Sequence, residues 1–369
     1  MFSIRDFWRR HRRKLLVTAG VIGSGYLLYK LYEFPRRLES MQKELALQRE
    51  NDELLKAQMR AHFENIQMIS ESITLPHAMH DLNSRISEEL DLSQLLERLI
   101  KGKGQPNTLT SLEKLDLWDR LKILSFTRMA LSVWAMTMLN LYRRVQVNIL
   151  GRYLYIDTAR SLRSSYILEG ADVLDREDQQ KFLGSVNYFF DCGMPKLISD
   201  MEASIKEVIQ GKKLRDFISI TVLHNIIMQI LDTFMSTGSP HHWVNYMMPE
   251  NTKSWQRPSS SDGTVISDFT KFDQLMVETQ AVLSSAEFGN VVEISLKVVV
   301  DKLVDDMGAQ FGGGILASGV PLAKVLPQVA QMCPLLLEEP SKNQFIQLLK
   351  NIPEVELFFT LLYSNMPAL

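Results

Sequence analysis

Residues 129–142 read MALSVWAMTMLNLY, which is fourteen consecutive positions without a charge. A helix needs about 20 apolar residues to cross a bilayer, so this run is short for a membrane span. Arg128 precedes the run and Arg143 and Arg144 follow it directly. These features favour a buried helix, and we predict a core helix over residues 126–150.

The sequence on both sides of this run has helical periodicity and no useful stretch of strand-like alternation. Thr110 and Glu113 have the spacing of a capping box, which predicts the start of a helix that carries Leu115, Trp118 and Leu121 on one face. The other predicted helices cover residues 35–72, 81–101, 153–170, 178–209, 214–236, 268–285, 287–309, 321–337 and 341–363. The sequence therefore predicts an all-α fold, a large elongated helical bundle.

Breakers and polar interruptions divide this bundle. Pro76 is predicted to end the helix over residues 35–72. Gln48 and Asp52 interrupt its apolar stripe, which argues against the alternative of a coiled-coil homodimer through this helix. Residues 237–266 contain three prolines and a run of three serines, so we predict a flexible loop there.

The N-terminal segment joins a basic run to an apolar one. Residues 1–37 carry a net charge of +7, which leaves −9 for the rest of a chain whose total is −2. Residues 15–34, LLVTAGVIGSGYLLYKLYEF, contain only Lys30 and Glu33 as charged positions. A helix of about 20 residues spans the hydrocarbon layer, so this segment predicts a single transmembrane helix behind a basic tail, residues 1–14.

Other interpretations of the N-terminal segment remain open. A cleaved signal peptide also begins with basic and apolar residues, but no small-residue cleavage site follows Tyr29. A mitochondrial presequence is Arg-rich as well, although a spanning segment behind it would make it a membrane anchor. The positive-inside rule places the basic tail in the cytosol. We nevertheless expect the large acidic body to stay in the cytosol, because it lacks secretory features.

The sequence holds no signature of catalytic or metal chemistry. The glycines at 312–314 lack the Lys-Ser/Thr that follows in a phosphate loop. His77 and His80, and the pair His241 and His242, have no cysteine or carboxylate at ligand spacing. We therefore expect no cofactor, metal, nucleic acid or small-molecule substrate, and predict a protein-binding function rather than an enzyme.

The remaining candidates are a surface residue and two thiols. Trp118 is the first candidate for a binding contact, because tryptophan is enriched among interface hot spots. The alternative is that Trp118 packs inward. Cys192 and Cys333 are interpreted as free thiols in a reducing compartment.

Two blocks of sequence resemble the peroxisomal biogenesis factor 3 (peroxin-three) family. They are EKLDLWDRLKILSFTR at residues 113–128 and RVQVNILGRYLYID at residues 144–157. YMMP at residues 246–249 and VPLAK at residues 320–324 agree with the same family. The similarity extends over essentially the whole chain, and the segments GSGYLLYKLY (residues 23–32) and RENDELLKAQMRAHF (residues 49–63) are closest to plant members.

The resemblance implies a single-pass peroxisomal membrane protein whose residues 35–369 form a cytosolic docking domain. In the family this domain receives the N-terminal amphipathic helix of peroxin nineteen, the import receptor that delivers new membrane proteins. An alternative function is a tether between peroxisomes and cytoskeletal or autophagy adaptors. By position in the family motifs, the resemblance assigns Leu96, Lys114, Trp118 and Asn148 to the partner-binding groove. Leu115 and Leu121, which lie beside Trp118 on the same helix, are expected to line the groove with them. It assigns to targeting and to contact with peroxisomal membrane lipids Arg9, Arg10, Arg12, Arg13 and Lys14.

Each assigned residue type implies a physical role. The leucines and Trp118 are expected to bury the apolar face of the incoming helix. Lys114 is expected to contact its acidic side or its terminal carbonyls, and Asn148 to hydrogen-bond a polar group at the edge. The basic tail is expected to attract anionic headgroups by about 1 kcal/mol per cation.

Overall fold

The chain divides into two compact units, Met1–His62 and Phe63–Leu369. The boundary falls inside the helix predicted over residues 35–72, and the described positions of the first unit are helical. The predicted basic tail and the predicted transmembrane segment lie outside the described residues. The computed structural model describes residues 60–104, 110–163, 174–249, 270–310 and 319–364, with scattered positions between 46 and 58.

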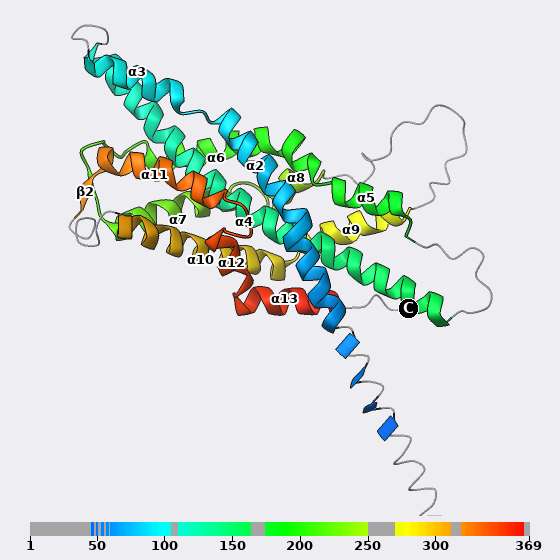
Figure 1. Cartoon of the computed structure of the whole chain (residues 1–369). Helices are drawn as coiled ribbons and strands as arrows, with labels where there is room; N and C mark the ends of the chain where they lie inside the picture. The colour runs from blue at the N-terminus through cyan, green and yellow to red at the C-terminus, as the bar shows by residue number, and fades with distance from the viewer. Residues whose placement is uncertain are drawn as a thin grey trace, which may run out of the picture. The chain divides into compact units, whose positions relative to one another are not determined.

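The second unit is all-α and is built around α4 (Ser111–Arg163), a helix of 53 residues (Figure 1). At 1.5 Å per residue this helix is about 80 Å long. Three helices were predicted over this stretch, and the structure joins them into one because the segment contains no proline and a single glycine, Gly151. That glycine serves packing, since a Cβ there would lie 2.5 Å from Cδ1 of Ile66.

The predicted capping box opens α4 as expected. The backbone N–H of Glu113 donates to the Thr110 hydroxyl at 3.2 Å, and the Thr110 N–H donates to the Glu113 carboxylate at 2.7 Å. The two bonds satisfy donors that the first turn of a helix leaves without partners.

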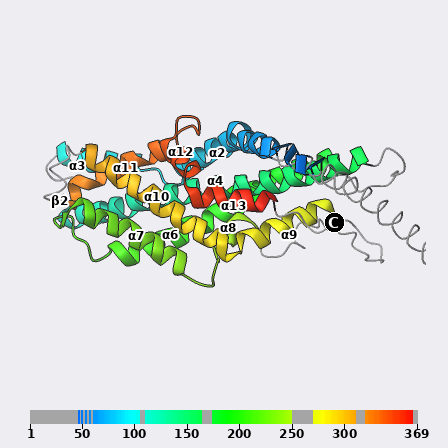
Figure 2. The ribbon, with the colours of Figure 1, turned by 90° about the horizontal axis from the view of Figure 1, so that it is seen from below.

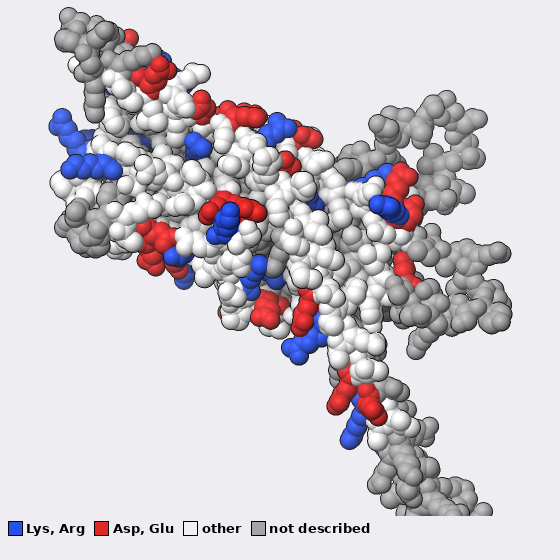
Figure 3. Space-filling view, viewed as in Figure 1, with Lys and Arg blue, Asp and Glu red and all other residues white. Residues whose placement is uncertain are grey.

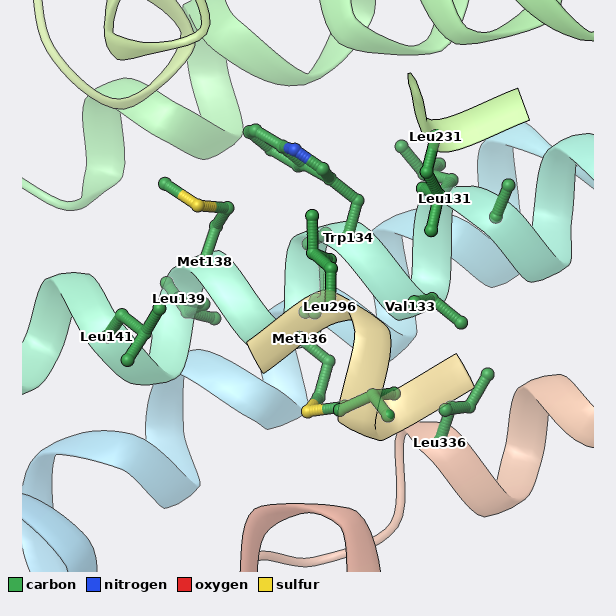
Figure 4. Close-up of a cluster of buried hydrophobic side chains, with 14 of the residues drawn as sticks. Leu131, Val133, Trp134, Met136, Met138, Leu139, Leu141, Leu231, Leu296 and Leu336 are labelled. Carbon is green, nitrogen blue, oxygen red and sulfur yellow. The ribbon is translucent and has the colours of Figure 1, made fainter. Parts of the chain in front are cut away.

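The uncharged run at residues 129–142 forms the centre of the core. Every one of these residues is buried, which confirms the predicted core helix. Trp134 and Met138 point to one side of α4, while Val133 and Met136 point to the opposite side (Figure 4). Because helices surround α4, its central part buries apolar side chains all round. Among the residues that the structure describes, no helix is long and apolar enough to cross a membrane.

Four helices make most of the contacts with α4 and lie side by side with it in Figures 1 and 2. They are α2 (Leu75–Glu89), α6 (Met194–Ile209), α10 (Ala286–Gln310) and α11 (Leu322–Leu336). The other helices are α3 (Ser93–Gly104), α5 (Arg176–Gly184), α7 (Ile220–Ser236), α8 (Val244–Met247), α9 (Lys271–Leu283), α12 (Gln344–Lys350) and α13 (Pro353–Ser364). Two short strands, β1 (Phe217–Ile218) and β2 (Val320–Pro321), pair antiparallel.

Pro76 does not end a helix, contrary to the prediction. The helix that contains residues 60–69 continues through a π-helical turn, η1 (Ser70–Thr74), directly into α2. Pro76 occupies the first turn of α2, where a missing backbone N–H costs little. The wider π-turn also gives the proline ring room that a regular α-helix would fill with a carbonyl.

Three other predicted helices are divided. The helix predicted over residues 81–101 is split between the end of α2 and α3, and residues 90–92 belong to neither. A second π-turn, η2 (Phe189–Gly193), lies between α5 and α6 within the helix predicted over residues 178–209. The helix predicted over residues 341–363 is broken before Pro353 into α12 and α13.

Residues 237–249 fold onto the core, although the sequence predicted a loop there. Trp243 and Tyr246 are each 2% exposed, and the single helical turn α8, which follows Trp243 and ends before Met248, contains Tyr246. The ring of Tyr246 stacks on Phe234 and meets Trp134 edge-on. Residues 250–266, the rest of the predicted loop, lie outside the described residues.

Candidate protein-binding groove

A groove of about 850 Å³ lies between α3, α4 and α11. One wall comes from α4, whose residues at the groove follow a spacing of four, three, four and three. This spacing places them on a single face of the helix. They are Lys114, Trp118, Leu121, Ser125 and Arg128. From first to last this stripe measures about 21 Å along the helix axis.

The second wall comes from α3 and presents exposed apolar side chains. Leu96 and Ile100 line the groove and are 42% and 68% exposed, respectively. Asp91 positions the start of this helix, because its carboxylate accepts the Ser93 N–H at 2.8 Å. Hydrogen bonds from the Ser93 side chain and from its backbone N–H lower the pKa of Asp91, and the charge of nearby Arg128 lowers it further. The helix thus leaves apolar surface facing the groove that no described residue covers.

The third wall comes from α11, which sequence reasoning did not assign to the site. Pro327 and Pro334 lie inside this helix and both line the groove, together with Leu326, Ala330 and Gln331. The two prolines are seven residues apart and therefore share a face. Two prolines on one face of an amphipathic helix could have identified this wall from the sequence. Proline inside a helix lowers stability, so two prolines on one face indicate a role other than helix formation.

Four of the six residues assigned to the groove from sequence meet in it: Leu96, Lys114, Trp118 and Leu121. Leu115 does not line the groove and is 54% exposed on α4. It follows Lys114 by one residue, and neighbouring residues of a helix point about 100° apart.

Asn148 also lies away from the groove. It is 30 residues beyond Trp118 on the same helix, which corresponds to about 45 Å. Its side chain is 1% exposed, accepts a hydrogen bond from Gln67 at 3.0 Å and donates to the Arg144 carbonyl at 2.6 Å. Asn148 therefore fixes the helix that contains Gln67 against α4, and burial prevents it from forming the edge of the groove.

The two charged residues that line the groove are both basic, while the carboxylate of Asp91 lies near Arg128 just outside the lining. Lys114 and Arg128 line it at opposite ends of the α4 stripe, and no carboxylate is present among its described lining residues. The surface over α3 and α11 is mostly uncharged in Figure 3. An apolar groove with a cation at each end suits an amphipathic segment that carries acidic side chains.

A model of the Peroxin-3 family matches residues 6–111 and 103–365, which together cover nearly the whole chain. The chain belongs to the Peroxin-3 family. It is 59% identical to Peroxisome biogenesis protein 3-2 and 55% identical to Peroxisome biogenesis protein 3-1 of Arabidopsis thaliana, each over 100% of both chains. It is 27% identical to human Peroxisomal biogenesis factor 3, over 98% of this chain and 96% of the human protein.

Membership of the Peroxin-3 family confirms the resemblance stated from the sequence, including the greater similarity to plant members. The family and the names of these relatives support a role in peroxisome biogenesis. The relatives are named as biogenesis proteins and factors, and not as enzymes.

The described part of this Peroxin-3 family member contains no group of three His, Cys, Asp or Glu side chains that could hold a metal ion. Cys192 is exposed and Cys333 is buried, and both are free thiols, as expected from the sequence. The chemistry that the groove offers is therefore apolar contact and positive charge.

Proposed function

We propose that the chain serves peroxisome biogenesis as a docking receptor, and that the groove between α3, α4 and α11 receives the N-terminal amphipathic helix of peroxin nineteen. Docking of that import receptor at the peroxisomal membrane delivers the membrane proteins that it carries. The observation that carries this proposal is an apolar groove whose walls come from α3, α4 and α11 and which has space for a fourth helix.

The dimensions of the groove support a helical occupant. The stripe on α4 is about 21 Å long, which corresponds to about four turns of a helix lying alongside. Exposed Leu96 and Ile100 supply apolar surface, and burying such surface contributes about 25 cal/mol per Å². The incoming helix thus supplies the apolar cover that this end of the bundle lacks.

Trp118 has both of the roles that the sequence left open, a binding contact and inward packing. Its side chain is partly buried and packs against the core, and it also lines the groove. An aromatic ring held in this way is pre-positioned for binding, so little conformational entropy is lost when a partner covers it. It is therefore the strongest single contact that the groove can offer.

The proposal is tested by calorimetry with the full-length chain in detergent micelles and a peptide of the N-terminal helix of peroxin nineteen. We expect Trp118→Ala to weaken binding at least tenfold, because truncated hot-spot tryptophans cost about 2 kcal/mol or more. The matched control is Leu112→Ala, since Leu112 lies on the same helix, is 80% exposed and does not line the groove. Equal affinity of the two variants, with unchanged circular dichroism, would reject this groove as the docking site.

We propose further that residues 15–34 anchor the chain in the peroxisomal membrane, with residues 35–369 in the cytosol. The 20 residues contain only Lys30 and Glu33 as charged positions, both near one end. Protease treatment of intact peroxisomes should then remove a C-terminal tag and spare an N-terminal one. The opposite pattern of protection contradicts this orientation.

A further inference from the structure

Two polar side chains in the groove lack the partners that such groups normally have. Ser125 is 1% exposed, and its hydroxyl is buried without a hydrogen-bond partner among the described residues. The Nε of Arg128 is likewise buried without a partner in the described part of the chain. Both side chains line the groove, three residues apart on the same face of α4. The two unpartnered groups therefore face the same space.

Ser125 differs from other hydroxyl residues of α4 because its unpartnered hydroxyl is at the groove; the Thr137 hydroxyl is also buried without a described partner, but Thr137 does not line the groove. Thr127 and Ser132 donate their hydroxyls to the carbonyls four residues earlier, at 2.9 and 2.7 Å. This bond is the usual solution for a hydroxyl inside a helix. The Ser125 hydroxyl makes no such bond and stays available to a group in the groove.

Arg128, which is only partly buried, differs from the buried Arg143 at its terminal nitrogens, since the Nε of Arg143 lacks a described hydrogen-bond partner as the Nε of Arg128 does. Arg143 donates to the carbonyl of Leu183 at 2.7 Å, and Arg152 forms an ion pair with Glu278. No described residue accepts a hydrogen bond from the Arg128 guanidinium or forms an ion pair with it. Leaving a buried donor without a hydrogen bond costs free energy, so a partner that supplied acceptors would recover that cost on binding.

We propose that Ser125 and Arg128 form a carboxylate pocket that receives one Asp or Glu side chain of the docked helix. The inference rests on the proposed function, because it takes a helix as the occupant of the groove. The serine hydroxyl and the planar guanidinium donate hydrogen bonds to the two oxygens of a carboxylate. Charge-assisted hydrogen bonds of this kind are about twice as strong as neutral ones.

The pocket gives the docked helix a fixed register. The contacts that apolar side chains make along a groove are similar from one helical turn to the next. A bound helix can therefore shift by one turn at a small cost in binding free energy. A single polar contact at one position removes this freedom, as a buried asparagine does in coiled coils. Lys114 does not duplicate the effect, because it is exposed and lies about 21 Å from Arg128 along α4.

A side-chain carboxylate fits this pocket better than the backbone of the bound helix. Backbone carbonyls within a helix are already bonded internally, and only the last four are free. An acidic side chain can reach the pocket from any turn that faces α4. Its charge also complements a groove whose described lining residues include two cations and no carboxylate.

A double-mutant cycle tests the pocket with the full-length chain in micelles and the peroxin-nineteen helix peptide. Arg128→Gln is expected to weaken binding about tenfold and Ser125→Ala about threefold, while Arg120→Gln has no effect. Arg120 is the matched control, since it is exposed on α4 and does not line the groove. Each Asp or Glu of the peptide is then replaced in turn by Asn or Gln.

One acidic position of the peptide should couple to Arg128. Its replacement should weaken binding to the unchanged chain about tenfold and leave binding to Arg128→Gln nearly unaffected. Additive losses at every acidic position would overturn the pocket, and so would a loss with Arg128→Gln that no acidic position shares, which would indicate contact with terminal carbonyls. Absence of any binding by the unchanged chain would reject the proposed function and the pocket together.

Stability provides a second readout that separates a binding role from a structural one. Without peptide, Ser125→Ala and Arg128→Gln should leave the urea midpoint unchanged or raise it, because each removes a buried polar group that lacks a partner. A clear decrease in the midpoint for both variants would mean that the residues stabilise the fold, and would overturn the assignment.

Discussion

Gly193→Ala tests how firmly residues 237–249 are held against the bundle. Gly193 ends the π-turn η2, and a Cβ built on it would lie 2.0 Å from the carbonyl oxygen of Tyr246 and 2.8 Å from its carbonyl carbon. Tyr246 has little freedom to move away. Its hydroxyl donates to Asp200 at 2.6 Å, and its ring stacks on Phe234 with centroids 5.9 Å apart.

The structure sets the size of the effect. Ordinary contact with a Cβ begins near 3.4 Å, so the two segments must separate by more than 1 Å to accept the methyl group. Overpacking of this kind costs about 1–3 kcal/mol or more. Alanine recovers about 0.5–1 kcal/mol, because it loses less backbone entropy than glycine in a helix. We expect a net loss of about 2 kcal/mol in the free energy of unfolding.

Urea unfolding of the full-length chain in detergent, followed by circular dichroism, measures this loss. The control is Gly184→Ala in α5, where an added Cβ meets nothing within 4 Å. That variant should be unchanged or slightly more stable. If both variants unfold at the same urea concentration, Tyr246 does not lie against η2 as the structure has it, and the flexible loop predicted from the sequence becomes the better description.

Two further substitutions probe buried charge and pH dependence. Arg152→Met should lower the free energy of unfolding by about 3 kcal/mol in urea titrations, because Arg152 is 3% exposed and its loss removes the cation of the ion pair with Glu278. A loss no larger than that of an exposed pair, below about 1 kcal/mol, would contradict this. Burial lowers the pKa of His242, so its neutral form stabilises the fold above pH about 6.5 and that contribution falls as the pH drops through the lowered folded-state pKa. His242→Gln should therefore flatten the decrease in stability between pH 7 and 5, and identical pH profiles would count against this role.

The features that follow from local sequence were predictable. The uncharged run at residues 129–142 is buried, and Thr110 with Glu113 caps α4. Lys114 and Trp118 share a face of this helix because of their spacing, and the structure shows that this face lines the groove. Periodicity and capping are properties of a single segment, so one sequence was sufficient for them.

The features that depend on distant partners were not predictable in the same way. Asn148 has the same residue type as in the family motif, but only the packing of Gln67 beside it shows that it is buried. Proline usually ends a helix, but Pro76 does not, because the π-turn before it gives the proline ring room. The prolines and serines of residues 237–266 indicated a loop, whereas the rings of Trp243 and Tyr246 find partners on other helices.

The continuity of α4 has a mechanical consequence for the molecule. Its first turns form one wall of the groove, and its later turns carry Arg144, which lies over the ring of Phe359, and Arg152, which is paired with Glu278. A rod of hydrogen-bonded turns without a hinge passes an axial pull from one end to the other, whereas a loop would stretch. Traction on a helix bound beside Trp118 is therefore distributed along α4, from α11 at the groove to α9 and α13 near the other end of the helix.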